Sequence, residues 1–228
     1  MTVELQYIGH SAFYIKYNGY GILIDPFISQ NPLANIDINS LKVDDILVTH
    51  GHGDHLGDAV AIAKAKGARI TAIVELASWC AKQGVRTLGV NIGGKLEFPW
   101  GEVWFYNATH SSSVPGADDY VGVPTSIVMN IDGKTIYHAG DTGLHQDMKT
   151  IGEMYFPDVA LLPVGGFYTM GPKEASFAAK WLNAKKVIPM HYNTFDVIKQ
   201  NEEDIKRYFD KNSSSECVFL KPSEILTV

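Results

Sequence analysis

The sequence is poor in cysteine and contains no long uncharged apolar run. Cys80 and Cys217 are the only cysteines in 228 residues, too few for the disulfide framework of a small secreted protein. No uncharged apolar stretch approaches the roughly 20 residues that span a bilayer. The first residues also lack the basic-then-apolar layout of a signal peptide. We therefore expect a cytoplasmic protein that does not span or bind a membrane.

Positive charge is scarce as well. The chain has 19 Lys and Arg against 25 Asp and Glu, a net charge of −6, so it has no broad basic field to attract a phosphate backbone. This balance favours a small-molecule substrate and argues against extended nucleic-acid binding. The hydrophobic content of 46% is enough for one well-buried core. We expect residues 1–228 to form a single domain.

The first half of the chain has the pattern of strands followed by strand–helix alternation. Apolar and β-branched residues dominate the first thirty positions, and Asn18-Gly19 between two such runs is a hairpin signal. Residues 44–50 then predict a short buried strand, 55–67 an amphipathic helix and 68–74 another strand. This β–α–β order requires part of the sheet to be parallel and covered by helices. A further helix is expected near residues 75–84.

The second half repeats this mixture in a similar order. Residues 95–110 and 124–141 predict long antiparallel strands, with a tight turn at Asp132-Gly133. Buried strands at 157–164 and 186–191, a helix beginning at Pro172 and an amphipathic helix at 201–210 follow. The two halves together favour two sheets packed face to face with helices outside them.

Histidines and acidic residues occur where the predicted strands end. His50, His110 and His191 each close an apolar run, and Asp141 follows another. Residues at strand ends can converge at one sheet edge, where α/β folds place their sites. Imidazole and carboxylate groups bind Zn²⁺ well and also suit manganese or iron. We therefore predict a metal site at this edge.

The segment from His50 to His55 has the pattern H-x-H-x-D-H. Alternate residues of an extended segment point the same way, whereas the turn into the following helix directs the last two elsewhere, so one loop can serve two metals. The alternative is a polar turn with a helix-capping aspartate. That alternative is weaker, because buried imidazole clusters without a metal or charge partner are costly.

The motifs THGHGDHLGD (49–58), HSSS (110–113), HAGDTGLH (138–145) and IPMHYNTF (188–195) resemble the metallo-β-lactamase fold superfamily. The likeness is greatest to a branch of bacterial and archaeal metal-dependent hydrolases similar to L-ascorbate 6-phosphate lactonase. It extends from GHSAF (9–13) through IDPF (24–27) to HYNTF (191–195). The resemblance implies an α/β fold, a four-layer αββα sandwich of two mixed β-sheets with helices on the outer faces.

The resemblance also implies a ligand set. His50, His52 and His110 would bind a first metal ion, Asp54, His55 and His191 a second, and Asp141 would bridge the two. The cofactor is then two divalent metal ions per chain, with Zn²⁺ the first choice and Mn²⁺ and then iron the alternatives. Asp141 stands where antibiotic-degrading members usually carry cysteine, which argues against antibiotic hydrolysis. The RNA-clamping insertion of tRNA-processing members is also not evident.

The function predicted on this basis is that of a dinuclear metal-dependent hydrolase. A metal-bridging hydroxide would cleave a small ester, lactone or phosphodiester bond. Asp54 would orient the nucleophile and accept its proton, and Asp141 would fix the metal separation. His10 either contacts the substrate, donating a proton to the leaving group, or is a hydrogen-bonded structural histidine.

Two other functions remain as alternatives. A di-iron redox or oxygen-reducing module uses the same fold and nearly the same ligands, although no flavin domain is attached here. A non-catalytic scaffold would require missing ligands, and none is missing. Related enzymes often form homo-oligomers, and the sequence leaves the oligomeric state open.

Several residues near the motifs carry weaker expectations. His138 is expected in the core or behind the ligands, and His145 in the pocket or on an exposed loop. Thr49 and Thr142 adjoin ligands and could orient them. The loops 111–113 and 165–172 are expected at the pocket rim, with an apolar wall formed by Phe167, Tyr168 and Met170.

Overall fold

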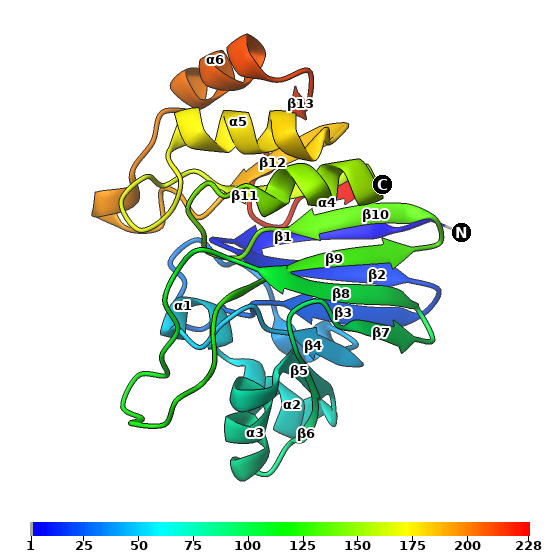
Figure 1. Cartoon of the computed structure of the whole chain (residues 1–228). Helices are drawn as coiled ribbons and strands as arrows, with labels where there is room; N and C mark the ends of the chain where they lie inside the picture. The colour runs from blue at the N-terminus through cyan, green and yellow to red at the C-terminus, as the bar shows by residue number, and fades with distance from the viewer. Residues whose placement is uncertain (1) are drawn as a thin grey trace.

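The computed structural model describes residues 2–228, which form two seven-stranded sheets (Figure 1). The first sheet contains β1 (Glu4–Gly9), β2 (Ala12–Tyr17), β3 (Tyr20–Ile24), β4 (Asp45–Leu47), β5 (Arg69–Ile73), β6 (Arg86–Val90) and β14 (Ile225–Thr227). The second contains β7 (Lys95–Phe98), β8 (Gly101–Asn107), β9 (Thr125–Ile131), β10 (Lys134–His138), β11 (Val159–Pro163), β12 (Lys186–Met190) and β13 (Glu216–Cys217). Their spatial orders are β14-β1-β2-β3-β4-β5-β6 and β13-β12-β11-β10-β9-β8-β7.

Both sheets are mixed. In the first, β1, β2 and β3 are antiparallel, and β3, β4, β5 and β6 are parallel. In the second, β7 to β10 are antiparallel, and β10 to β13 are parallel. The predicted hairpins and the parallel β–α–β unit are therefore confirmed. Asn18 and Gly19, like Asp132 and Gly133, have positive φ angles, as a two-residue turn matched to strand twist requires.

The helices cover the outer faces of the two sheets (Figure 1). They are α1 (Gly53–Leu56), α2 (Ala59–Lys66), α3 (Val74–Lys82), α4 (Asp147–Tyr155), α5 (Pro172–Leu182) and α6 (Glu202–Asn212). Helix α2 packs on β5 and α3 packs on β5 and β6, whereas α5 packs on β11 and contacts α4 and α6. The four-layer αββα sandwich is confirmed. No helix within residues 2–228 combines the length and the apolarity needed to cross a membrane.

Alternate side chains of a strand belong to different parts of the hydrophobic core. In β2, Phe13 and Ile15 join the cluster between the two sheets, whereas Tyr14 joins the cluster beneath α2 and α3. Successive side chains of a strand point to opposite faces, so a strand buried on both faces must be apolar at every position. Its hydrophobic run follows directly from this double burial.

Helix α4 was not predicted from the sequence, and its central glycine shows why. A Cβ atom added to Gly152 would lie 2.2 Å from the carbonyl oxygen of Trp181. Gly152 lowers the helix propensity of the segment, but it permits the close approach of α4 to α5. Tertiary packing thus stabilises a helix that local propensity disfavours.

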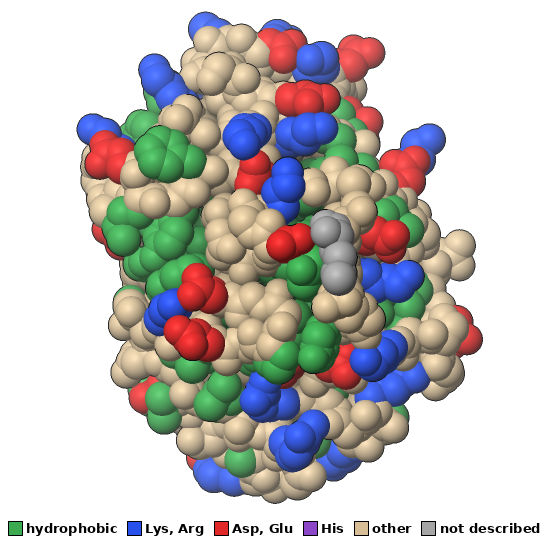
Figure 2. Space-filling view, turned by 90° about the vertical axis from the view of Figure 1, so that its right-hand side faces the viewer, with side chains coloured by type: hydrophobic (Ala, Val, Ile, Leu, Met, Phe, Trp, Pro, Cys, Tyr) green, Lys and Arg blue, Asp and Glu red, His purple; other side chains and the backbone are tan. Residues whose placement is uncertain are grey.

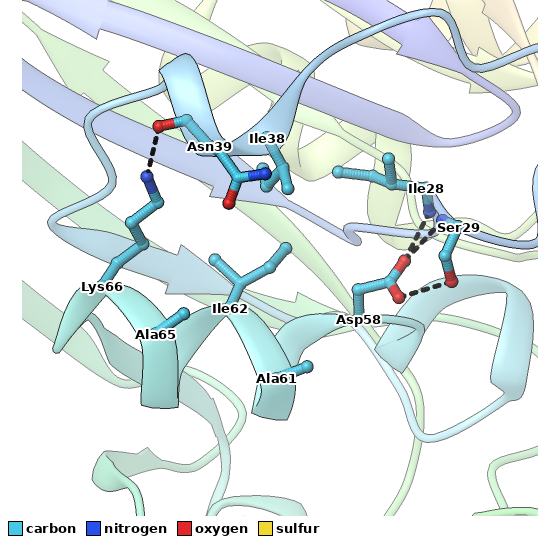
Figure 3. Close-up of a pocket in the computed structure, with 9 residues that line it drawn as sticks. All are labelled: Ile28, Ser29, Ile38, Asn39, Asp58, Ala61, Ile62, Ala65 and Lys66. Carbon is cyan, nitrogen blue, oxygen red and sulfur yellow. Dashed lines mark hydrogen bonds between the residues drawn. The ribbon is translucent and has the colours of Figure 1, made fainter.

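The segment 28–39 is tied to α2 by polar contacts (Figure 3). Asp58 accepts hydrogen bonds from the backbone N–H groups of Ile28 and Ser29 and from the Ser29 hydroxyl, and Lys66 donates to the Asn39 carbonyl. A mainly aliphatic hollow of about 220 Å³ remains between them. It is lined by no histidine, so the predicted chemistry lies elsewhere.

Candidate metal centre

The predicted ligands converge at one end of the sandwich. His10 follows β1, His50 follows β4, and His110, Asp141 and His191 come after β8, β10 and β12. Within each sheet these strands run in the same direction, so their carboxyl ends share an edge. The opposite end, which faces the viewer in Figure 2, shows interspersed charges and no histidine.

One group of candidate ligands consists of His50, His52 and His110. One nitrogen from each ring lies within 4.8 Å of the others. His50 Nε2 and His52 Nδ1 are 3.0 Å apart. The N–H of His50 Nδ1 can donate to the Thr49 hydroxyl 3.0 Å away, which leaves the Nε2 lone pair directed at the group. This arrangement suits a cation that accepts nitrogen ligands.

A second group lies beside the first and contains Asp54, His55 and His191. One ligand atom of each lies within 4.8 Å of the others, together with a nitrogen of His10. Asp54 and His55 belong to the short helix α1, and the His55 ring lies beside His50 of the first group, with ring centroids 4.2 Å apart. One loop thus supplies residues to both groups, which adjoin at His50 and His55.

Asp141 lies between the two groups. Its Oδ1 atom is 3.2 Å from His55 Nε2, and its Oδ2 atom is 3.0 Å from His191 Nε2 and 3.6 Å from His110 Nε2. Both oxygens thus approach the second group, and Oδ2 also approaches His110 of the first group, so this carboxylate is placed where it could be shared by two cations. The structure therefore brings all seven predicted ligands together.

The electrostatics of the site favour positive charge at its centre. Burial by itself would lower the pKa of His55, but the Asp141 and Asp25 carboxylates on either side raise it well above the ordinary value. Burial would likewise raise the pKa of Asp141, but the neighbouring His191 and His55 hold it well below the ordinary range. The buried carboxylates thus require a proton or a cation beside them.

Buried polar atoms that lack a well-directed hydrogen bond indicate whether these residues suit a metal ion. His55 Nε2, Asp141 Oδ1 and both ring nitrogens of His191 are buried and make no hydrogen bond of good geometry, although His55 Nε2 and His191 Nε2 lie 3.2 and 3.0 Å from the Asp141 carboxylate. Buried polar groups are normally satisfied, and each exception requires an explanation. All of these atoms except His191 Nδ1 point within the cluster and are of the types that bind zinc. The residues fit a metal centre.

Asp25 is a residue of the site that the sequence analysis did not assign. It is fully buried and accepts hydrogen bonds from the Thr49 backbone N–H (2.8 Å), the Thr49 hydroxyl (2.7 Å) and His55 Nδ1 (2.7 Å). It therefore orients one candidate ligand directly and supports His50 through Thr49. The signal was an acidic residue after an apolar strand, in the motif IDPF, but it lacked a nearby second ligand.

His10 lies behind Asp54 and does not line the open pocket. It is completely buried, with Nδ1 2.8 Å from the Thr194 hydroxyl and Nε2 3.1 Å from Asp54 Oδ2. Burial and the neighbouring His191 lower the pKa of His10 to about 4. A neutral ring that donates from Nε2 to Asp54 and accepts at Nδ1 from Thr194 satisfies both contacts. The geometry suits positioning of Asp54 better than contact with substrate.

The weaker sequence predictions also concern His138, Thr142 and His145, which lie around the site. His138 accepts from the Gly140 backbone N–H and donates from Nε2 to the Ser11 carbonyl, so it joins the two sheets. Thr142 accepts from the Thr109 backbone N–H, which holds together the loops of His110 and Asp141. His145 is largely buried and does not line the pocket.

The pocket over the ligands has a volume of about 470 Å³. His52, Asp54, His110 and Asp141 form its polar floor, with Ser111 at the edge, and Tyr168, Phe195 and Val197 form an apolar wall. Of the three apolar residues predicted here, Tyr168 lines the pocket, Phe167 is exposed beside it, and Met170 is buried in the core. The Met170 side chain belongs to the core cluster, and its backbone N–H donates to the Thr142 carbonyl.

Comparison with known proteins identifies relatives of the whole chain. Residues 4–191 match the family described as "Beta-lactamase superfamily domain". A UPF0173 metal-dependent hydrolase from Geobacillus thermodenitrificans is 52% identical over 204 residues, which cover 88% of this chain and 90% of the relative.

Solved structures also resemble this chain. A metallo hydrolase from the hyperthermophilic archaeon Ignicoccus hospitalis shares 40% identity with a TM-score of 0.92, covering 100% of this chain and 99% of that one. A diiron β-hydroxylase from Streptomyces venezuelae has a TM-score of 0.69 at 14% identity and covers 100% of this chain and 53% of that one, a likeness of fold alone.

Proposed function

This chain belongs to the β-lactamase superfamily and, within it, to the UPF0173 metal-dependent hydrolases, and on that premise we propose that it hydrolyses a small ester, lactone or phosphodiester with two divalent cations. The observation that carries the proposal is the convergence of the three-histidine group and the Asp54, His55 and His191 group, with Asp141 in contact with both. One cation would be held by His50, His52 and His110 and the other by Asp54, His55 and His191, with Asp141 bridging. This donor set contains nitrogen and carboxylate oxygen and no thiolate, which suits Zn²⁺ first.

The side chains around the pocket have distinct tasks in this proposal. Bound divalent cations would lower the pKa of a water molecule and stabilise negative charge on the substrate. Asp54 has a side chain that is 28% exposed, so its Oδ1 atom can accept a hydrogen bond from that water and orient it, while His10 contacts Oδ2. Asp141 is buried and held from both sides, which suits a fixed spacing and not proton transfer.

The pocket volume and the net charge of the chain indicate the kind of substrate. The pocket of about 470 Å³ suits a small molecule, and the net charge of −6 argues against extended nucleic acid. We propose a cytoplasmic enzyme in which residues 1–228 act as one hydrolase domain.

Metal analysis and a substrate screen test the proposal together. Protein purified and reloaded with Zn²⁺ or Mn²⁺ is expected to hold two ions per chain and to hydrolyse at least one ester, lactone or phosphodiester. A chelator should abolish the activity, and Asp54→Ala should reduce it about a hundredfold or more. Asp210→Asn, on the exposed side of α6, is the matched control. Activity that survives in Asp54→Ala, or a single bound ion at saturation, would contradict the proposal.

A di-iron redox function is the competing proposal, because iron accepts the same nitrogen and oxygen donors. Protein that retains iron, consumes oxygen with a reductant and hydrolyses none of the substrates would favour it. Zinc or manganese with hydrolysis and no oxygen uptake would exclude it.

A further inference from the structure

The apolar wall of the pocket is exposed to solvent next to the candidate metal centre. Tyr168, Phe195 and Val197 are 53%, 37% and 52% exposed. All three line the same pocket as Asp54 and Asp141. Exposed large hydrophobic side chains that gather at one place usually mark a binding surface. Because this surface is continuous with the candidate metal centre, its occupant would be part of a molecule that reaches the reacting atoms.

The wall is held in place before any ligand binds. The Phe195 ring packs edge-on against His10, with ring centroids 5.4 Å apart, and lies 6.4 Å from Phe27. At the base of its loop, Asn193 donates its backbone N–H to Ile198 and accepts from the backbone of Gln200 through Oδ1. A surface fixed in this way loses little conformational entropy on binding. It therefore suits recognition of a particular group.

The same wall provides no compensation for negative charge. No Lys or Arg of residues 2–228 lines the pocket. The nearest cation in the sequence of this loop is Lys199, whose Nζ lies 2.8 Å from Asp196. An anionic group placed along the wall would lose hydration without gaining a cationic partner, which is unfavourable. An uncharged apolar group would instead gain from covering the exposed rings.

We infer that the substrate is an uncharged carboxylic ester or lactone whose acyl portion is aromatic or branched aliphatic and lies against Tyr168, Phe195 and Val197. The inference rests on the proposed hydrolase function and narrows it to substrates whose group along the wall is uncharged and apolar. Water adds to the carbonyl carbon, the bond from that carbon to the alcohol oxygen breaks, and the alcohol oxygen takes up a proton. The products are a carboxylic acid and an alcohol, which for a lactone are the two ends of a single hydroxy acid.

Binding of hydroxamic acids tests the apolar wall and the metal centre separately. Every hydroxamate binds a metal through its own two oxygens, so only the attached group reports on the wall. Zinc-loaded protein is titrated by calorimetry with acetohydroxamic, benzohydroxamic and 4-carboxybenzohydroxamic acids. Covering part of a phenyl ring should make benzohydroxamate bind about five- to tenfold more tightly than acetohydroxamate. The added carboxylate should cancel this gain.

Variants of the wall complete the test. In Phe195→Ala and, separately, in Val197→Ala, the ratio of benzohydroxamate affinity to acetohydroxamate affinity should fall to about twofold or less. The affinity for acetohydroxamate itself should stay unchanged. Met154→Ala removes a side chain that is 59% exposed on α4, outside the pocket, and should keep the full preference. Equal preference in wild type and wall variants, or tightest binding of the carboxylated probe, would overturn the inference. Loss of binding for all three probes would instead overturn the proposed metal centre.

Discussion

His55 Nδ1 lies 2.7 Å from Asp25 Oδ2, and both side chains are completely buried. Because the Asp25 carboxylate can only accept, the proton of this hydrogen bond is on Nδ1, and Nε2, 3.2 Å from Asp141, is the nitrogen that faces the candidate centre and could bind a cation. Histidine ligands commonly have such a carboxylate partner, which sets the tautomer and the ring orientation. Asp25 is therefore a positioning residue of the candidate centre.

Asp25→Asn is predicted to weaken metal binding. The amide cannot accept from both Thr49 and His55 as the carboxylate does, so Zn²⁺ affinity should fall about 10- to 100-fold. Competition with a chromophoric chelator measures the effect. Asp210→Asn should retain wild-type affinity, and an Asp25→Asn protein that binds both ions as tightly as wild type would refute the role of Asp25.

His10→Asn is predicted to affect metal retention and to leave substrate affinity unchanged. Asparagine tolerates the left-handed backbone at this position (φ 59°) but is too short to replace the contact with Asp54. One of the two ions should bind about tenfold more weakly, and His10→Gln should restore part of the affinity.

The alternative role of His10 has a different signature. If His10 touches the substrate, KM or kcat would change in His10→Asn while both ions bind normally. Thr194→Val should reproduce the weaker metal binding on a smaller scale, because its hydroxyl lies 2.8 Å from His10 Nδ1.

Asp45→Ala is predicted to destabilise the fold. Asp45 in β4 accepts from Trp100 Nε1 (2.8 Å), which belongs to the other sheet's first turn, and from Arg69. Its loss leaves the buried indole N–H unsatisfied, at a cost of about 1 to 3 kcal/mol. Urea unfolding measures this change, and the exposed Glu97→Ala should shift stability by less than about 0.5 kcal/mol. An equal effect of the two substitutions would contradict the role of Asp45.

Asp158 is predicted to make stability depend on pH. Burial would raise its pKa, but hydrogen bonds from Lys185 and the Thr135 backbone lower the pKa below the ordinary value. The carboxylate therefore stabilises the fold above its unfolded pKa of about 3.9, and this stabilisation is lost as the pH falls through the lower folded value. The difference in unfolding free energy between wild type and Asp158→Asn should be largest near neutral pH and shrink below about pH 4. A difference that stays constant with pH would contradict the prediction.

Much of the fold could be predicted because its signals are local. Asn18-Gly19 and Asp132-Gly133 require positive φ angles that match hairpin turns, and Pro172 begins α5 as predicted. Strand ends were less accurate: the strand predicted over 44–50 ends at Leu47 in the sheet, because Thr49 and His50 leave the ladder to meet Asp25 and the ligand cluster. Helix α4 depends on contact with α5 and has no strong local signal.

The sequence by itself determined which side chains could bind a metal, since His50, His52, Asp54 and His55 are close together along the chain and the other candidates follow strand ends. Only the tertiary structure decided which groups stand behind them. Asp25 and Thr194 reach His55 and His10 across 30 and 184 residues of chain, and Met170 turns into the core while Phe195 and Val197 face the pocket. The type of a side chain limits its chemistry, whereas its partners and its exposure are set by long-range packing.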